Sequence, residues 1–335
     1  MTSMKIVVDD KIPYIREKLD VLADEVVALS GAAITADDVR DADALIVRTR
    51  TRCDERLLGG SKVRFVATAT IGFDHIDTAY LDRVGISWTN CPGCNAGSVA
   101  QYVECSLLQL QRLHGLRLAG ATIGIVGCGH VGTKVRAVAE RLGMRVLVCD
   151  PPLGLADFVP LADIEREADI VTFHVPLTRD GQHATWHLAD DGFFRRLSRV
   201  PYIINTSRGP VVDNAALLAA LDEGRVRGAV LDVWEDEPRV NLDLLQRVLI
   251  GTPHIAGYSA DGKVNADNMV IDALCRQFHL RHPGTIVPPS LPATFTYSGD
   301  PLQLYDPLAD SRKLKASPSD FELLRNNYPL RRECF

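Results

Sequence analysis

The stretch that decides the fold is IGIVGCGHVGTKVRAVAERLGMRVLVCD, residues 123–150. It opens with a short apolar run of the kind found in a strand buried on both faces. The glycine-rich turn Gly127-Cys128-Gly129-His130-Val131-Gly132 follows, and then a segment that can be helical from Val131 to Leu142. A second apolar run, 146–149, ends the stretch at Asp150. Strand, turn, helix, strand and acid in this order, within about 30 residues, form the fingerprint of a dinucleotide-binding unit.

Each glycine of the turn has its own task. Gly127 permits the tight turn, Gly129 lets the backbone approach a pyrophosphate, and Gly132 lets the helix lie against the strand. The N-terminus of the helix offers unpaired N–H groups and a positive dipole end to the phosphates. Asp150 can accept hydrogen bonds from both ribose hydroxyls but would repel a 2'-phosphate, and no arginine follows it. We therefore predict an NAD site rather than an NADP site.

The composition is that of a soluble globular protein of two domains. The chain has 335 residues, with 46% hydrophobic and 24% charged side chains. Its formal net charge of -6 argues against nucleic acid as the main partner. No apolar run approaches the roughly 20 residues of a membrane span, and the first residues do not resemble a signal peptide. The eight cysteines are too sparse for a disulfide scaffold, so we expect a cytoplasmic protein without a membrane or nucleic-acid partner.

The first 96 residues alternate short strands with helical segments, which is typical of a parallel sheet covered by helices. We predict a helix over 13–23 and strands over 4–8, 44–47, 63–67 and 85–88. Ligands of such sheets bind at the carboxyl ends of the strands. Arg48, Thr49 and Thr70 follow two of these strands, and we predict that they line a substrate pocket. Arg48 is our candidate for a substrate phosphate, because arginine binds phosphate through two parallel hydrogen bonds.

The same alternation continues after the fingerprint. Strands are predicted over 169–175, 201–206, 228–233 and 248–254, followed by a helix from Asn265, and a long helical pattern over 99–113 precedes the fingerprint. The predicted fold class is α/β, with two doubly wound parallel-sheet (Rossmann/flavodoxin-like) domains, a cleft between them and a short C-terminal region. The expected boundaries are 1–96 completed by 259–285 for the substrate domain, 97–258 for the NAD-binding domain and 286–335 for the C-terminal region.

Three polar residues at strand ends are candidates for the chemistry. If their strands are neighbours, Arg208, Glu237 and His254 converge on one cleft. Arginine can bind a carboxylate with two parallel hydrogen bonds, and histidine can take the proton of an alcohol. A carboxylate beside that histidine would orient the ring and favour the imidazolium. Singly, each residue is more often a surface or turn residue, but together with an NAD fingerprint they predict an oxidoreductase site.

These segments also carry a family resemblance. The chain resembles the D-isomer-specific 2-hydroxyacid dehydrogenases in GCGHVG (127–132), HVPLT (174–178), NTSRGPVVD (205–213), LDVWEDEP (231–238) and TPHIAGYS (252–259). Narrower similarity lies in VVDDKIPY (7–14), ATATIGFDHID (67–77), CPGCNAGSVAQYV (91–103), FHVPLTRDG (173–181) and HIAGYSADGK (254–263). It points to members that oxidise a phosphorylated four-carbon 2-hydroxy acid in pyridoxal phosphate synthesis and that form homodimers through the C-terminal region.

The resemblance implies roles for individual residues. Arg208 and Glu237 would be active-site residues and His254 the proton donor or acceptor. Asp232 would lie near the nicotinamide amide. Position 49 is threonine where serine is familiar, which keeps the hydroxyl. The remaining implied residues are Thr49, Thr70 and Tyr258 at the substrate, and His130, Val131, Asp150, Thr206, Ser207 and Gly257 around NAD.

Other functions are weighed against this one. Another 2-hydroxyacid dehydrogenase, of the phosphoglycerate, glycerate or lactate type, would keep the same catalytic residues. An NAD-sensing corepressor on this fold would have a long disordered tail, and a formate-dehydrogenase-like relative would have glutamine in place of Glu237. We predict no metal site, because Cys91-Pro-Gly-Cys94 lacks the second pair that zinc requires. His174, His183 and His187 are expected in structural or cofactor-edge positions.

Overall fold

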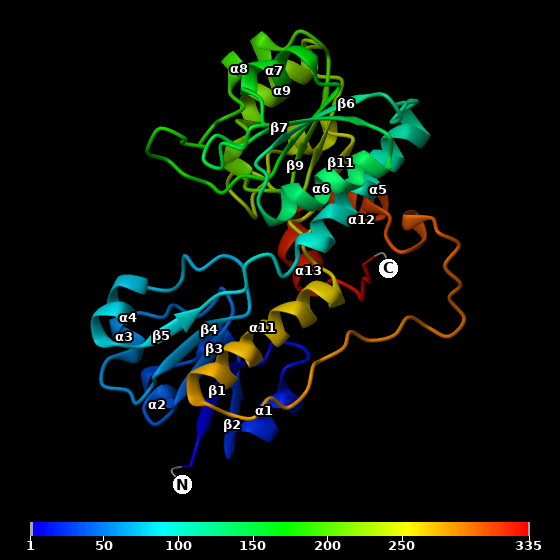
Figure 1. Cartoon of the computed structure of the whole chain (residues 1–335). Coiled ribbons are helices and arrows are strands. Elements are labelled where there is room, and N and C mark those ends of the chain that lie inside the picture. Colours follow the sequence, from blue (N-terminus) through cyan, green and yellow to red (C-terminus); the bar gives the residue numbers. More distant parts are fainter. Residues whose placement is uncertain (1–2, 334–335) are drawn as a thin grey trace. The chain divides into compact units, whose positions relative to one another are not determined.

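The computed structural model describes residues 3–333 and divides the chain into two compact units. Unit 1 comprises Met1–Asn95 and Ser259–Leu291, and unit 2 comprises Ala96–Tyr258 and Pro292–Phe335. Figure 1 shows a sheet flanked by helices in each unit. No helix within residues 3–333 is both long and apolar enough to cross a bilayer.

Unit 1 is built on a five-stranded sheet with all strands parallel, in the order β2-β1-β3-β4-β5. Successive side chains of its inner strands alternate between two cores: Ile46 packs in one with helix α11, and Leu45 packs in the other. Its elements are β1 (Lys5–Asp9), α1 (Arg16–Leu22), β2 (Glu25–Leu29), η1 (Gly31–Ala33), α2 (Ala36–Val39), β3 (Ala44–Val47), α3 (Glu55–Leu58), β4 (Phe65–Thr68), α4 (Thr78–Val84), β5 (Ser87–Thr89) and α11 (Ala260–Phe278).

Several boundaries in unit 1 differ from the sequence-based expectation. The helix predicted over 13–23 covers only Arg16–Leu22, and the strand predicted over 85–88 is Ser87–Thr89. The edge strand β2 was not predicted, because its exposed and half-buried side chains give it no continuous apolar run. Helix α11 begins at Ala260 rather than at Asn265, since the Ser259 hydroxyl caps it by accepting a hydrogen bond from Gly262 N at 2.8 Å.

Unit 2 contains a six-stranded parallel sheet in the order β11-β10-β9-β8-β6-β7. The chain crosses from one edge of this sheet back to its middle after β7, as in a doubly wound fold. The predicted α/β class with two parallel sheets is therefore confirmed. The elements are α5 (Ala96–His114), β6 (Thr122–Val126), α6 (His130–Arg141), β7 (Arg145–Cys149), α7 (Leu161–Glu167), β8 (Ile170–Phe173), α8 (Asp191–Arg196), β9 (Tyr202–Asn205), η2 (Gly209–Val211), α9 (Asn214–Asp222), β10 (Gly228–Leu231), α10 (Leu242–Arg247) and β11 (Ile250–Gly251).

The strands of unit 2 end earlier than their apolar runs suggested. β8 stops at Phe173, β10 at Leu231 and β11 at Gly251, although the predictions extended to 175, 233 and 254. Beyond these points the chain leaves the strand pairing and forms loops at the carboxyl edge of the sheet. The polar residues proposed for the site lie on these loops.

The C-terminal segment packs on unit 2. Helix α12 (Pro307–Ala316) contacts β11 and α5, and Leu314 and Phe321 belong to the same buried cluster as Phe173 and Phe193. Tyr305 joins the second cluster of the unit, with a ring centroid 5.9 Å from that of Tyr102. The other elements of this segment are η3 (Pro301–Gln303), η4 (Pro318–Asp320) and α13 (Phe321–Asn326).

Candidate active site

The glycine-rich turn has the geometry that its sequence requires. Gly127 has a φ of 91°, and a Cβ atom there would lie 2.7 Å from the His174 carbonyl oxygen. A Cβ atom on Gly132 would collide with the Gly127 carbonyl oxygen, so only glycine lets α6 start this close to β6. Beside Gly129, which precedes α6, a Cβ atom would meet no protein atom within 4 Å. The space next to Gly129 is therefore open to a ligand, and the turn fits a dinucleotide.

The Asp150 carboxylate closes this turn. Its Oδ2 atom accepts a hydrogen bond from Cys128 N at 2.7 Å, and Oδ1 accepts one from Leu153 N at 3.3 Å. The residues that follow, Pro151 and Pro152, carry no charge. A negative group at the tip of β7, with no cation following it, suits the two hydroxyls of an NAD ribose and repels a 2'-phosphate.

Glu237 and His254 lie within hydrogen-bond distance in unit 2. Nδ1 of His254 is 2.8 Å from Oε2 of Glu237, and both side chains are partly exposed. Oε1 of Glu237 accepts a hydrogen bond from Trp234 N at 2.8 Å, which fixes the carboxylate. With Nδ1 at the carboxylate, Nε2 is the nitrogen through which the ring could exchange a proton, and such a pair is typical of an orienting acid and a proton acceptor.

A buried aspartate shapes the loop that carries His254. Oδ1 of Asp232 accepts hydrogen bonds from Thr252 Oγ1 at 2.6 Å and from Ile255 N at 2.8 Å, and Oδ2 accepts one from Ala256 N at 2.9 Å. The Asp232 carbonyl oxygen accepts a further bond from His254 N at 2.8 Å. Burial raises the pKa of this carboxyl group above its usual value. Asp232 therefore holds the loop, independently of the cofactor contact predicted for it.

Arg208 lies on a turn organised by Asn205. The Asn205 side chain accepts hydrogen bonds from Ser207 N and Oγ, at 3.1 and 2.8 Å, and donates one to the Arg208 carbonyl at 3.0 Å. A Cβ atom on Gly209 would collide with the Trp234 carbonyl oxygen, so this turn lies against the segment leading to Glu237. The Arg208 side chain is exposed, and its Nη1 donates to the Ser207 carbonyl at 2.8 Å.

His174 and Thr206 meet at the same edge of the sheet. Nδ1 of His174 is 3.3 Å from Thr206 Oγ1, and Nε2 is 2.9 Å from Thr172 Oγ1. Burial lowers the pKa of His174 to about 3, so the ring is neutral at physiological pH. A neutral ring between two hydroxyls supports the predicted structural position of His174.

Sequence reasoning missed the group formed by His187, Asp213 and Glu235. Within residues 3–333, this is the only group of at least three His, Cys, Asp or Glu side chains whose possible metal-ligand atoms all lie within 4.8 Å of one another. His187 Nε2 is 2.7 Å from Glu235 Oε1, and its Nδ1 is 3.4 Å from Asp213 Oδ2. Glu235 Oε2 accepts a hydrogen bond from Asn214 N at 2.9 Å. Both histidine nitrogens already face carboxylates, so hydrogen bonding accounts for the group.

The C-terminal segment braces the loop that carries His254, which was not predicted either. The buried Arg331 donates to the carbonyl oxygens of Ser98 at 2.6 Å and Ile255 at 3.3 Å, and to Gln101 Oε1 at 3.0 Å. Its guanidinium carbon lies 3.8 Å from the centre of the Tyr305 ring. No local pattern in the sequence could indicate these hydrogen bonds, because the three acceptors are more than 70 residues away.

Tyr258, predicted at the substrate, is held by the same segment. Arg325 Nε donates to its hydroxyl at 3.0 Å, and the rings of Tyr258 and Tyr328 form an edge-to-face pair with centroids 6.0 Å apart.

The other predicted substrate residues belong to unit 1. Arg48 is half-buried directly after β3, and its Nη1 donates to the Lys11 carbonyl at 3.1 Å. Thr49 is exposed. Thr70 follows β4, and its hydroxyl donates to the Gly72 carbonyl at 2.8 Å and lies 2.6 Å from Thr68 Oγ1. All three residues lie at the carboxyl edge of the unit 1 sheet.

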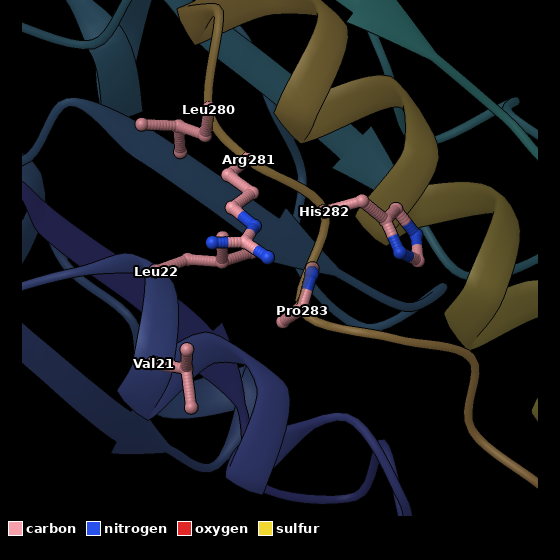
Figure 2. A pocket seen from close by; sticks show the side chains of 6 residues that line it. All are labelled: Val21, Leu22, Leu280, Arg281, His282 and Pro283. Atoms are coloured by element: carbon pink, nitrogen blue, oxygen red, sulfur yellow. The ribbon is translucent and has the colours of Figure 1, made fainter.

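Unit 1 has two other features besides these three residues. Figure 2 shows a hollow lined by Val21, Leu22 and the chain from Leu280 to Pro283, which follows α11. It lies where α1 ends before β2 begins, on the amino side of the strands. Cys91 of the C-x-x-C pair is buried, and its Sγ donates to the carbonyls of Thr68 and Ala266, each at 3.4 Å. The hollow includes His282, but it lies at the amino ends of the strands rather than at the carboxyl edge, where ligands of such sheets bind, and the Cys91 thiol is engaged by two backbone carbonyls.

The comparisons with known proteins agree with this geometry. Residues 98–256 match the family model "D-isomer specific 2-hydroxyacid dehydrogenase, NAD binding domain". The chain is 54% identical to an erythronate-4-phosphate dehydrogenase of Bacteroides fragilis, over 98% of this chain and 97% of that protein. It is 43% identical to the enzyme of the same name from Porphyromonas gingivalis, over 98% and 94%. The solved structure of NAD+-bound 3-phosphoglycerate dehydrogenase from Entamoeba histolytica is 27% identical, with a TM-score of 0.69 over 83% of this chain and 96% of that one.

Fold, glycine-rich turn and relatives together define an NAD-dependent dehydrogenase of the D-isomer-specific 2-hydroxyacid type. Within that class, the chain belongs to the erythronate-4-phosphate dehydrogenase family. The predictions of an oxidoreductase, of NAD as cofactor and of this family are thereby confirmed. The roles of the individual site residues stay predictions.

Proposed function

We propose that the enzyme oxidises 4-phospho-D-erythronate at C2, giving 2-oxo-3-hydroxy-4-phosphobutanoate, as a step in pyridoxal 5'-phosphate synthesis. The support is the name shared by relatives that match almost the whole chain at 43–54% identity. The observation that carries the chemistry is the 2.8 Å contact between Glu237 and His254. An alcohol at C2 loses hydride more readily once its proton is removed, and a histidine beside a carboxylate has the groups that this step requires.

In the proposed reaction, His254 Nε2 takes the proton of the C2 hydroxyl. Glu237 accepts a hydrogen bond from Nδ1–H, which keeps the second nitrogen available as an acceptor and then stabilises the imidazolium. Bound NAD+ supplies the acceptor for the hydride that leaves C2. In the reverse direction, the same imidazolium returns its proton to the 2-oxo oxygen.

Arg208 is proposed to bind the substrate carboxylate through two parallel hydrogen bonds and to polarise the adjacent C2 oxygen. Its exposed guanidinium, on a turn fixed by Asn205, supports this role. We further propose that Arg48, Thr49, Thr70 and Tyr258 contact the substrate.

The NAD site is proposed to contain residues from four loops of unit 2. The glycine-rich turn and the first turn of α6 would hold the pyrophosphate, and Asp150 would hold the ribose hydroxyls. The full proposed set is Gly127, Gly129, His130, Val131, Gly132, Asp150, Thr206, Ser207, Asp232 and Gly257.

Turnover of the purified protein with three acids tests the substrate. We expect selective oxidation of 4-phospho-D-erythronate over 3-phosphoglycerate and D-lactate, with NAD and a 2-oxo acid acceptor present and the product followed directly. His254→Ala should reduce the rate by about 10³-fold. Preference for another acid would keep the catalytic residues and overturn the substrate.

We also propose a cytoplasmic homodimer, with 1–96 and 259–285 as substrate domain, 97–258 as NAD-binding domain and 286–335 contributing to dimerisation. The low density of cysteines in the sequence supports the cytoplasmic assignment. The resemblance to the family supports the dimer. Light scattering behind size-exclusion chromatography tests it: a mass near 37 kDa instead of its double would exclude the dimer.

A further inference from the structure

The carboxyl edge of the unit 1 sheet holds a second cation besides Arg48. Helix α11 lies along β4 and runs in the opposite direction (Figure 1). Near its end, Phe278 packs against Phe65, the first residue of β4, with ring centroids 6.3 Å apart. Near its start, the Ala266 carbonyl accepts a hydrogen bond from the Cys91 thiol. The same thiol donates to the carbonyl of Thr68, the last residue of β4. Lys263 lies three residues earlier, about 4.5 Å further along the axis, and therefore beyond the carboxyl end of the strand.

Arg48 reaches the same edge from the sheet. It directly follows Val47, which pairs with Thr68. Its Nη1 donates to the Lys11 carbonyl, in the loop that follows β1. The same loop is tied to α11, because Tyr14 N donates to Asp267 Oδ2 at 3.2 Å. The loop after β1, the end of β3 and the first turns of α11 thus meet around Arg48, Lys263 and Asp267.

The electrostatics of this group favour an anion. Burial and the charge of Arg48 both lower the pKa of Lys263, so the two cations lie close enough to repel each other. Burial raises the pKa of Asp267 to about 7, and the Tyr14 amide, Arg48 and Lys263 offset this only in part. Near neutral pH the only carboxyl among the three groups is therefore often uncharged. Two cations held close together at the carboxyl edge of the sheet attract a dianion such as a phosphate group.

We infer that Arg48 and Lys263 form the site for the phosphate group of the substrate, with Lys263 as a specificity-determining residue that sequence reasoning did not identify. The inference rests on the proposed function, since it assigns the phosphate of that substrate. Arginine offers a planar fork to two phosphate oxygens, and lysine offers a compact charge to the third. The site lies beside Thr49 and Thr70, whose hydroxyls are proposed to contact the same molecule.

The test compares two acids that differ only in the phosphate. The ratio of kcat/KM for 4-phospho-D-erythronate to that for D-erythronate is measured for the wild type, for Lys263→Met and for Lys263→Arg. We expect Lys263→Met to lower kcat/KM for the phosphorylated acid by about 100-fold, and for the unphosphorylated acid by less than about threefold. Lys263→Arg should recover part of the loss. Lys62→Met is the matched control, because Lys62 is an exposed lysine of unit 1 paired with Asp41.

The possible failures are distinct. Equal losses on both acids, or no loss on either, would overturn the phosphate site while leaving the proposed function in place. A wild type that oxidises neither acid would contradict the proposed function, and binding of inorganic phosphate, measured by calorimetry, would then decide the site. The wild type should bind phosphate and Lys263→Met should bind it at least about tenfold more weakly. Equal binding by the two proteins would exclude the site, and matching thermal unfolding of the variants shows that they fold.

Discussion

The Glu237 carboxylate lies between two donors: Oε2 is 2.8 Å from Nδ1 of His254, and Oε1 accepts the Trp234 amide at 2.8 Å. Glutamine at this position would keep the Trp234 bond through its carbonyl oxygen and turn its NH₂ group toward Nδ1. That group favours the tautomer with a proton on Nε2, which cannot accept the proton of an alcohol. In the proposed mechanism, an oxygen that can only accept a hydrogen bond from Nδ1–H is therefore what allows His254 to act as a base.

Glu237→Gln should therefore reduce kcat by about 10³-fold with unchanged stability. Steady-state rates with the preferred acid measure the effect, and Glu223→Gln, an exposed glutamate of unit 2, is the control. Retention of more than a tenth of the wild-type kcat would show that Glu237 does not orient His254.

Asp150→Asn distinguishes the structural role of Asp150 in the glycine-rich turn from its proposed role in selecting NAD over NADP. The amide oxygen can still accept the hydrogen bond from Cys128 N, so the glycine-rich turn is kept. The charge that repels a 2'-phosphate is lost. We expect the KM for NAD to rise by about tenfold and the preference for NAD over NADP to fall by a similar factor. Asp157→Asn, at an exposed site paired with Arg136, should change neither value. An unchanged preference would mean that another group selects the cofactor.

The fingerprint was predictable because it is local. Residues 123–150 form consecutive elements, so the φ of Gly127 and the close approach of Gly132 follow from short-range geometry. Glu237 and His254 are 17 residues apart and follow neighbouring strands, β10 and β11. The carboxyl ends of neighbouring parallel strands lie at the same edge of a sheet, so the proximity of such a pair can be predicted from the sequence.

The contacts that escaped prediction are those that only tertiary packing creates. Arg331 reaches Ser98 across 233 residues of sequence, and nothing near either position indicates the other. Lys263 was part of a quoted motif, yet its significance depends on the direction of α11 and on the end of β3. The edge strand β2 escaped because its side chains are only partly buried.

His174 should make unit 2 less stable in acid. Its folded pKa of about 3 lies below the unfolded value of about 6.5, so the unfolded chain binds the proton first and stability is lost as the pH falls from about 6.5 toward 3. Between pH 7 and 5 this amounts to about 2 kcal/mol in the free energy of unfolding. His174→Asn should remove that part of the pH dependence, as measured by urea unfolding at both pH values. The exposed His114→Asn is the control, and parallel curves for all three proteins would contradict the assignment.

Arg331→Met should destabilise unit 2. It would leave three buried acceptors, the carbonyls of Ser98 and Ile255 and the Gln101 side chain, without their donor. We expect a loss of about 3 kcal/mol in the free energy of unfolding, together with a lower kcat, because Ile255 directly follows His254. Urea unfolding and steady-state rates measure the two effects. Arg312→Met, on the exposed face of α12, should change neither, and a similar result for Arg331→Met would show that the C-terminal segment does not brace the loop.

Removal of divalent metal should leave the activity unchanged. His187, Asp213 and Glu235 come close enough to share an ion, but hydrogen bonds already engage them: His187 Nε2 lies 2.7 Å from Glu235, and Asp213 Oδ1 accepts the amides of Ala215 and Ala216 at the start of α9. An ion would have to displace these bonds, and a histidine can offer it only one nitrogen. Dialysis against EDTA, with metal content followed by mass spectrometry, should therefore leave kcat within about twofold of its starting value. If the activity disappeared and returned with Zn²⁺ or Mn²⁺, and if His187→Asn abolished that return, the group would be a metal site after all.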